Sequence, residues 1–223
     1  SARIRDSEEE VFGDLRVTTT IGFGTLWLAP RLAKLYKLYP DLRVDLMLEE
    51  RVLDLPMREA DVAIRMKEPS QADLIRKRLM TVKMQLFATQ PYIDECGMPG
   101  KLEDLTHHRL ICQNANSAQV GASSNMVQHL LTYDVKSLLT VNNYFGVLQG
   151  VLQNLGLGIL PDYVSQDEQR LVHVLPEIQS ADVPVFLAYP EELRPSKRIA
   201  AFRDFVQEEI ISYRKDMRAK EKI

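Results

Sequence analysis

The order of strand-like and helix-like segments between residues 15 and 65 constrains the fold of this chain more than any other feature. Two segments alternate apolar and polar residues, as strands with one buried face do, and leucines at helical spacing lie between them. In chain order, the predicted elements are a strand over residues 15–19, a helix that begins near residue 28 and ends at Tyr39-Pro40, a strand over residues 42–48, a short helix over residues 54–59 and a strand over residues 61–65. Strands separated by helices pair in parallel through right-handed crossovers, so the sequence predicts an α/β fold.

A second unit of the same kind follows. Its predicted strands, together with the last strand of the chain, cover residues 82–89, 109–112, 135–141, 157–161 and 185–189. Asn142 or Asn143 is expected to cap a helix that Gly156 closes, and Ser196 is expected to cap a final amphipathic helix.

Two units of similar plan, joined near Ala88 and again near Ala188, predict a molecule with two lobes. We expect lobe I to comprise residues 13–87 and 190–212, and lobe II to comprise residues 88–189. Residues 1–12 are mostly charged and indicate the end of a linker helix or a tail, and residues 213–223 indicate a charged, frayed C-terminal tail.

Composition excludes several classes of protein. The 223 residues carry a formal net charge of −3, so the chain lacks the basic excess of a protein that binds nucleic acid by itself. No apolar run approaches the roughly 20 residues that cross a bilayer. Cys96 and Cys112 are too few for a disulfide framework, and residues 1–13 contain no apolar signal-peptide region, so we expect a reducing, cytoplasmic compartment.

The stretch Thr18-Thr19-Thr20-Ile21-Gly22-Phe23-Gly24-Thr25 joins the first predicted strand to the first helix. Hydroxyls and free amide hydrogens at the start of a helix can bind an anion, and glycines let a ligand approach the backbone. The same residues are equally typical of a strand end followed by a flexible turn. The stretch lacks the third glycine of a dinucleotide-binding fingerprint and the Gly-Lys-Ser/Thr of a phosphate loop, which argues against a nucleotide cofactor.

Amide side chains follow two predicted strands of the second unit. The first group is Gln113, Asn114, Asn116 and Ser117, and the second is Asn142 and Asn143. Ligands of open α/β sheets bind outside the carboxyl ends of strands, and amides both donate and accept hydrogen bonds, so these groups suit a small polar solute. Ordinary loop composition explains the first group as well, and a helix cap explains the second.

Other chemistries find little support in the sequence. His107 and His108 are neighbours that diverge on any regular element, and no spacing of ligands completes a metal site. The basic cluster formed by Lys67 and residues 76–78 is more typical of a solvated strand edge than of a phosphate site. No nucleophile elbow and no pair of carboxylates stands out, so we expect no catalytic residue, metal or cofactor.

Motifs spread over residues 13–210 resemble, in their order, the effector-binding domain of LysR-type transcriptional regulators. The motifs that carry this resemblance are Gly13-Asp14-Leu15-Arg16-Val17, Leu28-Ala29-Pro30, Leu38-Tyr39-Pro40-Asp41, Arg58-Glu59-Ala60-Asp61-Val62-Ala63-Ile64-Arg65, Ala88-Thr89-Gln90-Pro91-Tyr92-Ile93, Leu102-Glu103-Asp104-Leu105-Thr106-His107-His108-Arg109, Leu155-Gly156-Leu157-Gly158-Ile159-Leu160-Pro161-Asp162-Tyr163 and Ala200-Ala201-Phe202-Arg203-Asp204-Phe205. Each motif is weak alone, whereas the ordered set is specific. The threonine run and Arg58-Glu59-Ala60-Asp61 also resemble the LsrB-like subgroup, which is tied to stress and cell-envelope control in host-associated bacteria.

The resemblance implies a fold like that of type 2 periplasmic binding proteins. Such a fold has two Rossmann-like lobes with mixed sheets, a cleft between the lobes and two crossover strands as a hinge. It also implies that DNA is bound by an N-terminal winged helix-turn-helix domain that is absent from this chain. Members of the family form homodimers through this domain and commonly assemble as homotetramers when intact.

The family's ligand lies in the cleft against the first strand–helix loop, which corresponds here to Thr19, Thr20, Ile21 and Gly22. Loops of the second lobe, corresponding to Asn114 and Asn143, also contact it. This chain departs from members that bind carboxylates through a Ser or Thr in the middle of the loop, because Ile21 lies there.

The resemblance therefore predicts an effector-sensing domain that binds a small polar molecule and controls DNA binding by the full-length regulator. One alternative is a solute-binding protein of the same fold, against which the linker-like start and the lack of a signal peptide argue. Another is an enzyme similar to prephenate dehydratase. Its Thr-Arg-Phe signature is absent, since Ala88-Thr89-Gln90-Pro91 occupies the comparable hinge strand.

Overall fold

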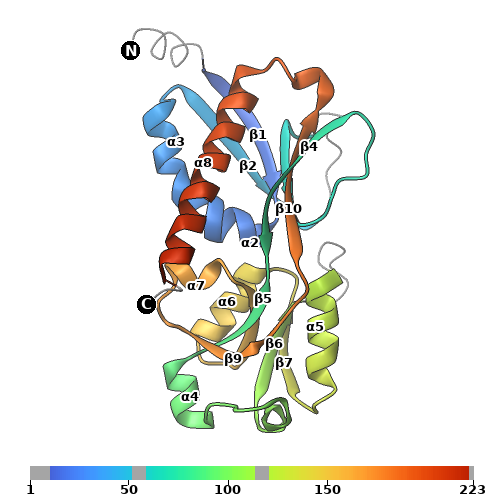
Figure 1. Ribbon diagram of the computed structural model, residues 1–223, viewed down its shortest axis with the longest axis vertical. Helices are drawn as coiled ribbons and strands as arrows, with labels where there is room; N and C mark the ends of the chain where they lie inside the picture. Colours follow the sequence, from blue (N-terminus) through green and yellow to red (C-terminus); the bar gives the residue numbers. More distant parts are fainter. Residues whose placement is uncertain (1–10, 52–58, 114–120, 221–223) are drawn as a thin grey trace. The chain divides into compact units, whose positions relative to one another are not determined.

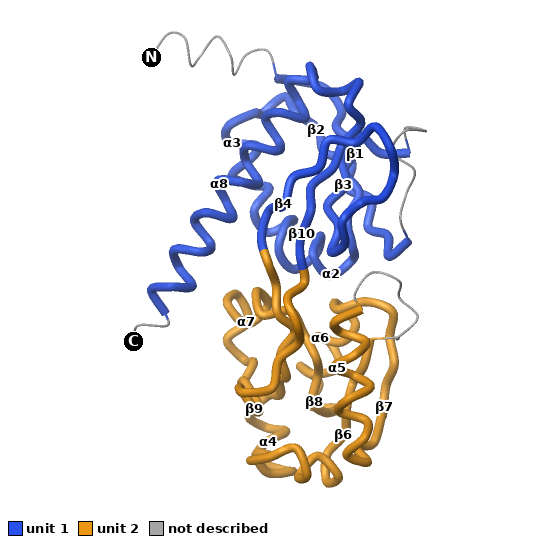
Figure 2. Tube along the Cα trace, turned by 45° about the vertical axis from the view of Figure 1, so that its right-hand side comes forward, with its two compact units in different colours: residues 1–80, 184–223 blue, residues 81–183 orange. Residues whose placement is uncertain are grey.

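The computed structural model describes residues 11–51, 59–113 and 121–220, and the chain divides into two compact units (Figures 1 and 2). Unit 1 contains residues 1–80 and 184–223, and unit 2 contains residues 81–183. The chain therefore crosses between units after Met80 and after Val183, whereas the sequence analysis placed the two crossings after Phe87 and Tyr189. The short helix predicted over residues 54–59 lies almost entirely outside the described residues, as does most of the segment before residue 13.

Unit 1 is built on a five-stranded mixed sheet with the order β2-β1-β3-β10-β4. Its strands are β1 (Gly13–Thr19), β2 (Leu42–Leu48), β3 (Val62–Arg65), β4 (Leu74–Val82) and β10 (Val183–Pro190). β1 pairs in parallel with both β2 and β3, and β10 pairs with β3 in the antiparallel sense. The predicted parallel core and the predicted mixed sheet are both confirmed.

Four consecutive helical segments connect β1 to β2. They are α2 (Ile21–Phe23), the π-helical η1 (Gly24–Leu28), the 3-10 helix η2 (Ala29–Arg31) and α3 (Leu32–Leu38). Pro30 lies at the start of η2, where its missing N–H costs nothing. Trp27, Leu28 and Leu35 are completely buried, while Tyr36 and Leu38 stay exposed. These apolar side chains therefore do not all join one core.

The last helix of unit 1 is longer than its sequence pattern indicated. α8 (Lys197–Lys220) packs against β1 and begins where Ser196 Oγ accepts a hydrogen bond of 3.4 Å from the Ile199 N–H, as predicted (Figure 1). The sequence predicted a charged tail from residue 213, but the helix continues through it. Tyr213 is buried and Arg214 Nη2 donates to the Leu79 carbonyl at 3.2 Å, and these contacts stabilise the additional turns. A short 3-10 helix, η4 (Glu191–Leu193), lies between β10 and α8.

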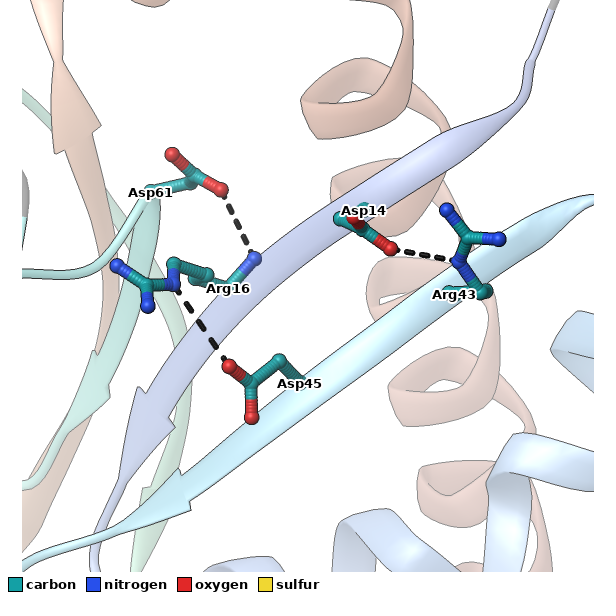
Figure 3. A network of polar contacts seen from close by, with 5 residues as sticks. All are labelled: Asp14, Arg16, Arg43, Asp45 and Asp61. Atoms are coloured by element: carbon teal, nitrogen blue, oxygen red, sulfur yellow. Dashed lines mark hydrogen bonds and ion pairs between the residues drawn. The ribbon is translucent and has the colours of Figure 1, made fainter.

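Charged pairs on the solvent side of β1 and β2 match the register of these strands (Figure 3). Asp14 lies opposite Arg43 and Arg16 lies opposite Asp45, with N···O distances of 2.6 and 3.7 Å. The Asp61 carboxylate accepts from the Arg16 backbone N–H at 2.8 Å and ties the start of β3 to β1. Solvent screens exposed pairs of this kind, so they add little stability and only support the register that the buried face of the sheet determines.

Unit 2 repeats the plan of unit 1 with the strand order β7-β6-β8-β5-β9. Its strands are β5 (Met84–Thr89), β6 (Arg109–Gln113), β7 (Lys136–Val141), β8 (Leu157–Pro161) and β9 (Leu171–Gln179). β6 pairs in parallel with β7 and β8, and β5 is antiparallel to β8 and β9. Its helices are α4 (Gln90–Cys96), η3 (Leu102–His107), α5 (Gly121–Leu131), α6 (Tyr144–Leu152) and α7 (Val164–Asp167).

The end of α6 requires a correction to the sequence analysis. Gly156 was expected to close this helix, but the helix ends at Leu152 and Asn154 adopts the left-handed conformation with φ of 61°. Gly156 is required for a different reason, since a Cβ atom there would lie 2.5 Å from the carbonyl oxygen of Arg109. Asparagine tolerates a positive φ because its short polar side chain can bond locally, and here its Oδ1 accepts from the Thr89 hydroxyl.

Within the described parts of the chain, no helix has the length and apolar character needed to cross a membrane.

Candidate functional site

Three parallel strands of unit 1 end beside one another and bring polar groups together. The register pairs Thr19 of β1 with Leu48 of β2 and with Ile64 of β3, so the residues that follow these positions share one edge of the sheet. Ligands of open α/β sheets bind at this edge. The residues gathered there, called the strand-end cluster below, are Thr18, Thr19, Thr20, Ile21, Glu49, Glu50 and Arg65.

Arg65 is the buried cation of the strand-end cluster. Only 4% of its surface is exposed, and its guanidinium donates to Thr18 Oγ1 at 2.8 Å and to the Glu49 carbonyl at 2.7 Å. Its Nε–H is buried and has no hydrogen-bond partner within residues 11–51, 59–113 and 121–220. Burial lowers the pKa of Arg65 from its ordinary value to about 10, and the nearby Glu50 and Glu49 charges oppose this shift. The side chain remains charged at neutral pH and links β1, β3 and the segment after β2.

Glu50 provides an anion to the same cluster. Its Oε1 accepts a hydrogen bond of 3.0 Å from the backbone N–H of Ile21, the first residue of α2. Burial raises the pKa of Glu50, and the Ile21 hydrogen bond and the Arg65 charge partly offset that effect. The amide that the sequence analysis offered to an anionic ligand is therefore already bound by a carboxylate of the protein.

The three threonines differ in their roles, although all are buried. Thr18 accepts from Arg65, and Thr20 caps α2 by accepting from the Phe23 N–H at 3.3 Å. Thr19 Oγ1 is buried and has no hydrogen-bond partner in the described part of the chain. The methyl group of Thr19 lies against Gly24, where an added Cβ would approach it to 2.8 Å. The predicted residues Thr19, Thr20, Ile21 and Gly22 therefore lie together at one strand–helix turn.

The corresponding edge of unit 2 carries the amide side chains. Gln113 is buried and its Nε2 donates to the Asn142 carbonyl at 3.2 Å, which joins the ends of β6 and β7. Asn143 is the N-cap of α6, with its Oδ1 accepting from the Gly146 N–H at 2.8 Å and its Nδ2 donating to Asn142 Oδ1 at 2.9 Å. Asn114 lies outside the described residues. Of the two predicted asparagines, Asn143 therefore has a defined structural role as a helix cap.

Asp162 is a carboxylate that the sequence analysis did not single out. It follows β8 and accepts from the Lys83 backbone N–H at 3.2 Å, while its own backbone N–H donates to the Lys83 carbonyl at 2.9 Å. Burial raises the pKa of Asp162 to about 6, although hydrogen bonds from Lys83 and Tyr163 and the Lys83 charge act in the opposite direction.

Asp162→Asn is expected to stabilise the protein at neutral pH. The pKa of Asp162 in the folded state lies above its ordinary value of 3.8, so the folded state binds the proton more tightly and the wild type loses stability as pH rises from about 4 to about 6. The amide avoids this loss and keeps an oxygen for the Lys83 N–H, so we expect a gain of about 1 kcal/mol at pH 8 that vanishes near pH 4. Unfolding curves at both pH values test this. The matched change Asp182→Asn removes an exposed ion pair with Lys83 and should have little effect.

The remaining candidate groups have structural roles. His108 is buried and its Nδ1 lies 3.0 Å from the Tyr92 hydroxyl, while His107 is exposed, so the two rings diverge as predicted. Cys112 is buried, which raises its thiol pKa and disfavours a reactive thiolate. Residues 76–78 lie exposed on the edge strand β4, as the sequence analysis favoured. Among the residues with described positions, no group of three or more His, Cys, Asp or Glu side chains could hold a metal ion.

Sequence reasoning missed Glu50 and Arg65 as members of the site. A signal for both is present, because Arg65 ends an otherwise apolar strand and Glu50 comes two residues after the end of another strand. Such a residue at the carboxyl end of a parallel strand is a candidate ligand group by the same rule that selected the threonines.

Comparisons with known proteins agree with this architecture. The family model described as LysR substrate binding domain matches residues 8–210. An uncharacterized HTH-type transcriptional regulator of Haemophilus influenzae is 24% identical over 182 residues, which cover 80% of this chain and 63% of that protein. An HTH-type transcriptional regulator of Xanthomonas campestris is 27% identical over 158 residues, which cover 69% of this chain and 46% of that protein. This chain thus spans less than two thirds of the length of these curated relatives.

Solved structures show the same fold. The regulatory domain of CrgA, a LysR-type transcriptional regulator from Neisseria meningitidis, superimposes with a TM-score of 0.75 at 22% identity, covering 89% of this chain and 99% of that one. The full-length virulence activator AphB of Vibrio cholerae gives a TM-score of 0.67 at 20% identity, covering 92% of this chain and 73% of that one. The two mixed-sheet units therefore match the periplasmic-binding-protein-like fold of these regulatory domains.

Proposed function

The chain belongs to the LysR substrate binding domain family, and we propose that it senses a small polar effector on behalf of a transcriptional regulator. The family match over residues 8–210 is the observation that carries this proposal. The strand-end cluster supports it, because buried polar groups at the carboxyl ends of parallel strands are where α/β sheets bind ligands. The family consists of regulators rather than enzymes, so the two alternative functions are not favoured.

We further propose that the whole protein binds DNA through a segment outside this sequence. The curated relatives are HTH-type regulators, and this chain spans only part of their length. The net charge of −3 of this chain suits a sensing role better than direct DNA contact. Such a regulator would act in the cytoplasm, where the bacterial chromosome lies.

The effector is proposed to contact Thr19, Thr20, Ile21 and Gly22 in unit 1 and Asn114 and Asn143 in unit 2. The unpartnered Thr19 hydroxyl supports the first group. The second group rests on the family resemblance, and Asn143 would have to serve a ligand in addition to capping α6.

Ligand binding can be tested on the purified chain. Native mass spectrometry should detect a co-purifying small molecule, and calorimetry should then give its affinity. Thr20→Val and Asn143→Ala should each weaken binding by about 1 to 3 kcal/mol, because each leaves a ligand group unpaired. Asn143→Asp keeps the cap oxygen but removes the amide donor, so it separates the loss of a ligand contact from the loss of a helix cap. Thr20→Ser keeps the hydroxyl for both roles and should bind the effector with nearly wild-type affinity. Wild-type affinity in both test variants would place the effector elsewhere.

We expect the chain to form a homodimer, as the resemblance implies. Tyr36 and Leu38 of α3 and Phe145 of α6 are large apolar side chains that remain exposed, by 39, 48 and 41% of their surface. Isologous pairing of such helices would cover them. Light scattering at tens of micromolar should give twice the chain mass of 25.5 kDa.

Leu38→Lys combined with Phe145→Lys should yield a folded monomer. Leu131→Lys on α5 is the matched control, because Leu131 is similarly exposed but lies on a helix that the proposed pairing does not use. A wild-type monomer mass, or loss of the dimer in the control, would contradict this assignment of the interface.

A further inference from the structure

The strand-end cluster contains its own anion, and this bears on which effectors it accepts. The first amide of α2, on Ile21, donates to Glu50 Oε1 at 3.0 Å. An anionic ligand group that approached this amide would meet a carboxylate already in place. It would have to displace Glu50 or lie beside a second negative charge, and neighbouring like charges cost free energy.

The buried cation of the cluster is also engaged. Both terminal nitrogens of the Arg65 guanidinium donate to protein oxygens, Nη2 to Thr18 Oγ1 and Nη1 to the Glu49 carbonyl. The Glu50 carboxylate compensates the Arg65 charge, as the opposing effects on the two pKa values show. Arg65 keeps its Nε–H and one N–H on each terminal nitrogen for a ligand, but its positive charge is already balanced by Glu50, so a ligand carboxylate would bring a second negative charge to a single cation.

Two buried polar atoms of the cluster have no partner among the residues that the structure describes. They are Oγ1 of Thr19, whose residue is fully buried, and Nε of Arg65. A hydroxyl can both donate and accept, and the Nε–H can only donate. Together with the carboxylate of Glu50, these groups suit a ligand that presents hydroxyl or amino groups.

We propose that Glu50 determines the specificity of the effector site, which selects a hydrogen-bond-donating solute without negative charge and rejects carboxylates. This inference rests on the proposed function, in which the strand–helix turn at Thr19–Gly22 contacts the effector. It replaces the expectation, drawn from the loop sequence alone, that the turn favours an anionic group.

Acetate is a probe that tests the role of Glu50 without a known effector. At constant ionic strength set with sodium chloride, acetate should not shift the Ile21 amide resonance of the wild type. Glu50→Ala vacates the amide and should bind acetate saturably, at least about tenfold more tightly than the wild type. Glu50→Gln keeps an oxygen at Ile21 but removes the charge, so its affinity for acetate should be intermediate.

Asp45→Ala is the matched control, because Asp45 lies on β2 outside the strand-end cluster and its side chain forms an exposed ion pair with Arg16. It should respond to acetate as the wild type does. Circular dichroism shows whether each variant is folded. If Glu50→Ala is not folded, the affinity of Glu50→Gln for acetate tests the proposal instead. Acetate binding at Ile21 in the wild type as tight as in the Glu50 variants would overturn the proposal, as would no binding in any variant.

A second measurement separates failure of this inference from failure of the proposed function. Benzoate, benzamide and benzylamine share one ring and differ in charge, and thermal unfolding of the wild type is followed with each. Stabilisation by the amide or amine but not by the acid supports the role of Glu50. Stabilisation by benzoate overturns it and leaves an effector-binding domain that accepts acids. A chain that binds neither these probes nor any co-purifying molecule loses support for the proposed function, while the acetate titration still decides whether Glu50 occupies the Ile21 amide.

Discussion

Arg65→Met is expected to destabilise unit 1 by roughly 3 kcal/mol. The substitution leaves Thr18 Oγ1 and the Glu49 carbonyl without their donor, and it removes the cation beside the partly buried Glu50 carboxylate. Each unpaired buried group costs about 1 to 3 kcal/mol, and relief of the burial cost of the guanidinium offsets part of the sum. The stability of Arg65→Lys should lie between that of the wild type and that of Arg65→Met, because one ammonium cannot reach both oxygens in the geometry of the guanidinium fork.

The single tryptophan of the chain gives this prediction a local probe. Trp27 is completely buried in unit 1, so its fluorescence reports the unfolding of that unit in urea. Arg194→Met is the control, since Arg194 forms an exposed ion pair with Glu191 at 3.3 Å, and it should change stability by less than about 0.5 kcal/mol. Equal unfolding midpoints for Arg65→Met and Arg194→Met would show that the strand-end cluster is not a stabilising network.

The double variant Arg65→Met with Glu50→Gln separates the two contributions to this loss. If the unpaired carboxylate accounts for part of the cost, removing its charge should recover about 1 kcal/mol relative to Arg65→Met alone. Recovery requires that the two side chains interact, so it also tests the charge compensation on which the proposed selectivity depends.

Periodicity was sufficient to predict the strands whose faces are clearly apolar. The strands of both parallel cores follow the predicted segments within a few residues. β9 was missed because Pro176 interrupts its pattern, and a proline is tolerated there since β9 is an edge strand. α4 was missed for a related reason. Pro91 was interpreted as the end of a strand, whereas it lies in the first turn of the helix, where proline is favourable.

The candidate site was only half predictable. The threonines could be selected because one contiguous stretch carries them, but their different roles depend on groups far away in the sequence. Thr18 needs Arg65, and the Ile21 amide needs Glu50; these partners come together only because β1, β2 and β3 are parallel and in a particular register. Conversely, Asn143 was selected as a ligand group by its position after a strand, yet its side chain is taken up by the cap of α6 and by Asn142.

Gly156→Ala is expected to destabilise unit 2 by about 2 to 3 kcal/mol. The added Cβ would lie 2.5 Å from the Arg109 carbonyl oxygen, closer than nonbonded atoms approach. That carbonyl cannot shift easily, because Arg109 lies in β6, which pairs with both β7 and β8. The Arg109 side chain adds a further restraint, since its Nε donates to the Leu155 carbonyl at 2.7 Å. Overpacking against a backbone atom costs about 1 to 3 kcal/mol or more.

Gly121→Ala is the matched control for this steric argument. Among the described residues, no atom lies within 4 Å of a Cβ at Gly121, which begins α5, so alanine should be neutral or stabilise the helix by up to about 1 kcal/mol. Far-ultraviolet circular dichroism in urea should show an earlier transition for Gly156→Ala and not for Gly121→Ala. Identical unfolding curves for Gly156→Ala and the wild type would contradict the prediction, because they would show that the β6 backbone shifts to accommodate the added methyl group.

Steric restriction at both positions explains why glycines recur in the motif Leu155-Gly156-Leu157-Gly158. A Cβ at Gly158 would overlap the side chain of Val151 in α6, so both glycines allow close packing of β8 against its neighbours. Packing within unit 2 is thus sufficient to explain both glycines. We therefore expect a folded Gly158→Ala protein to lose stability while keeping the acetate response of the wild type, whereas Glu50→Ala should change that response with a smaller loss of stability. A change in the acetate response of Gly158→Ala would show that this motif contributes to the effector site as well as to the fold.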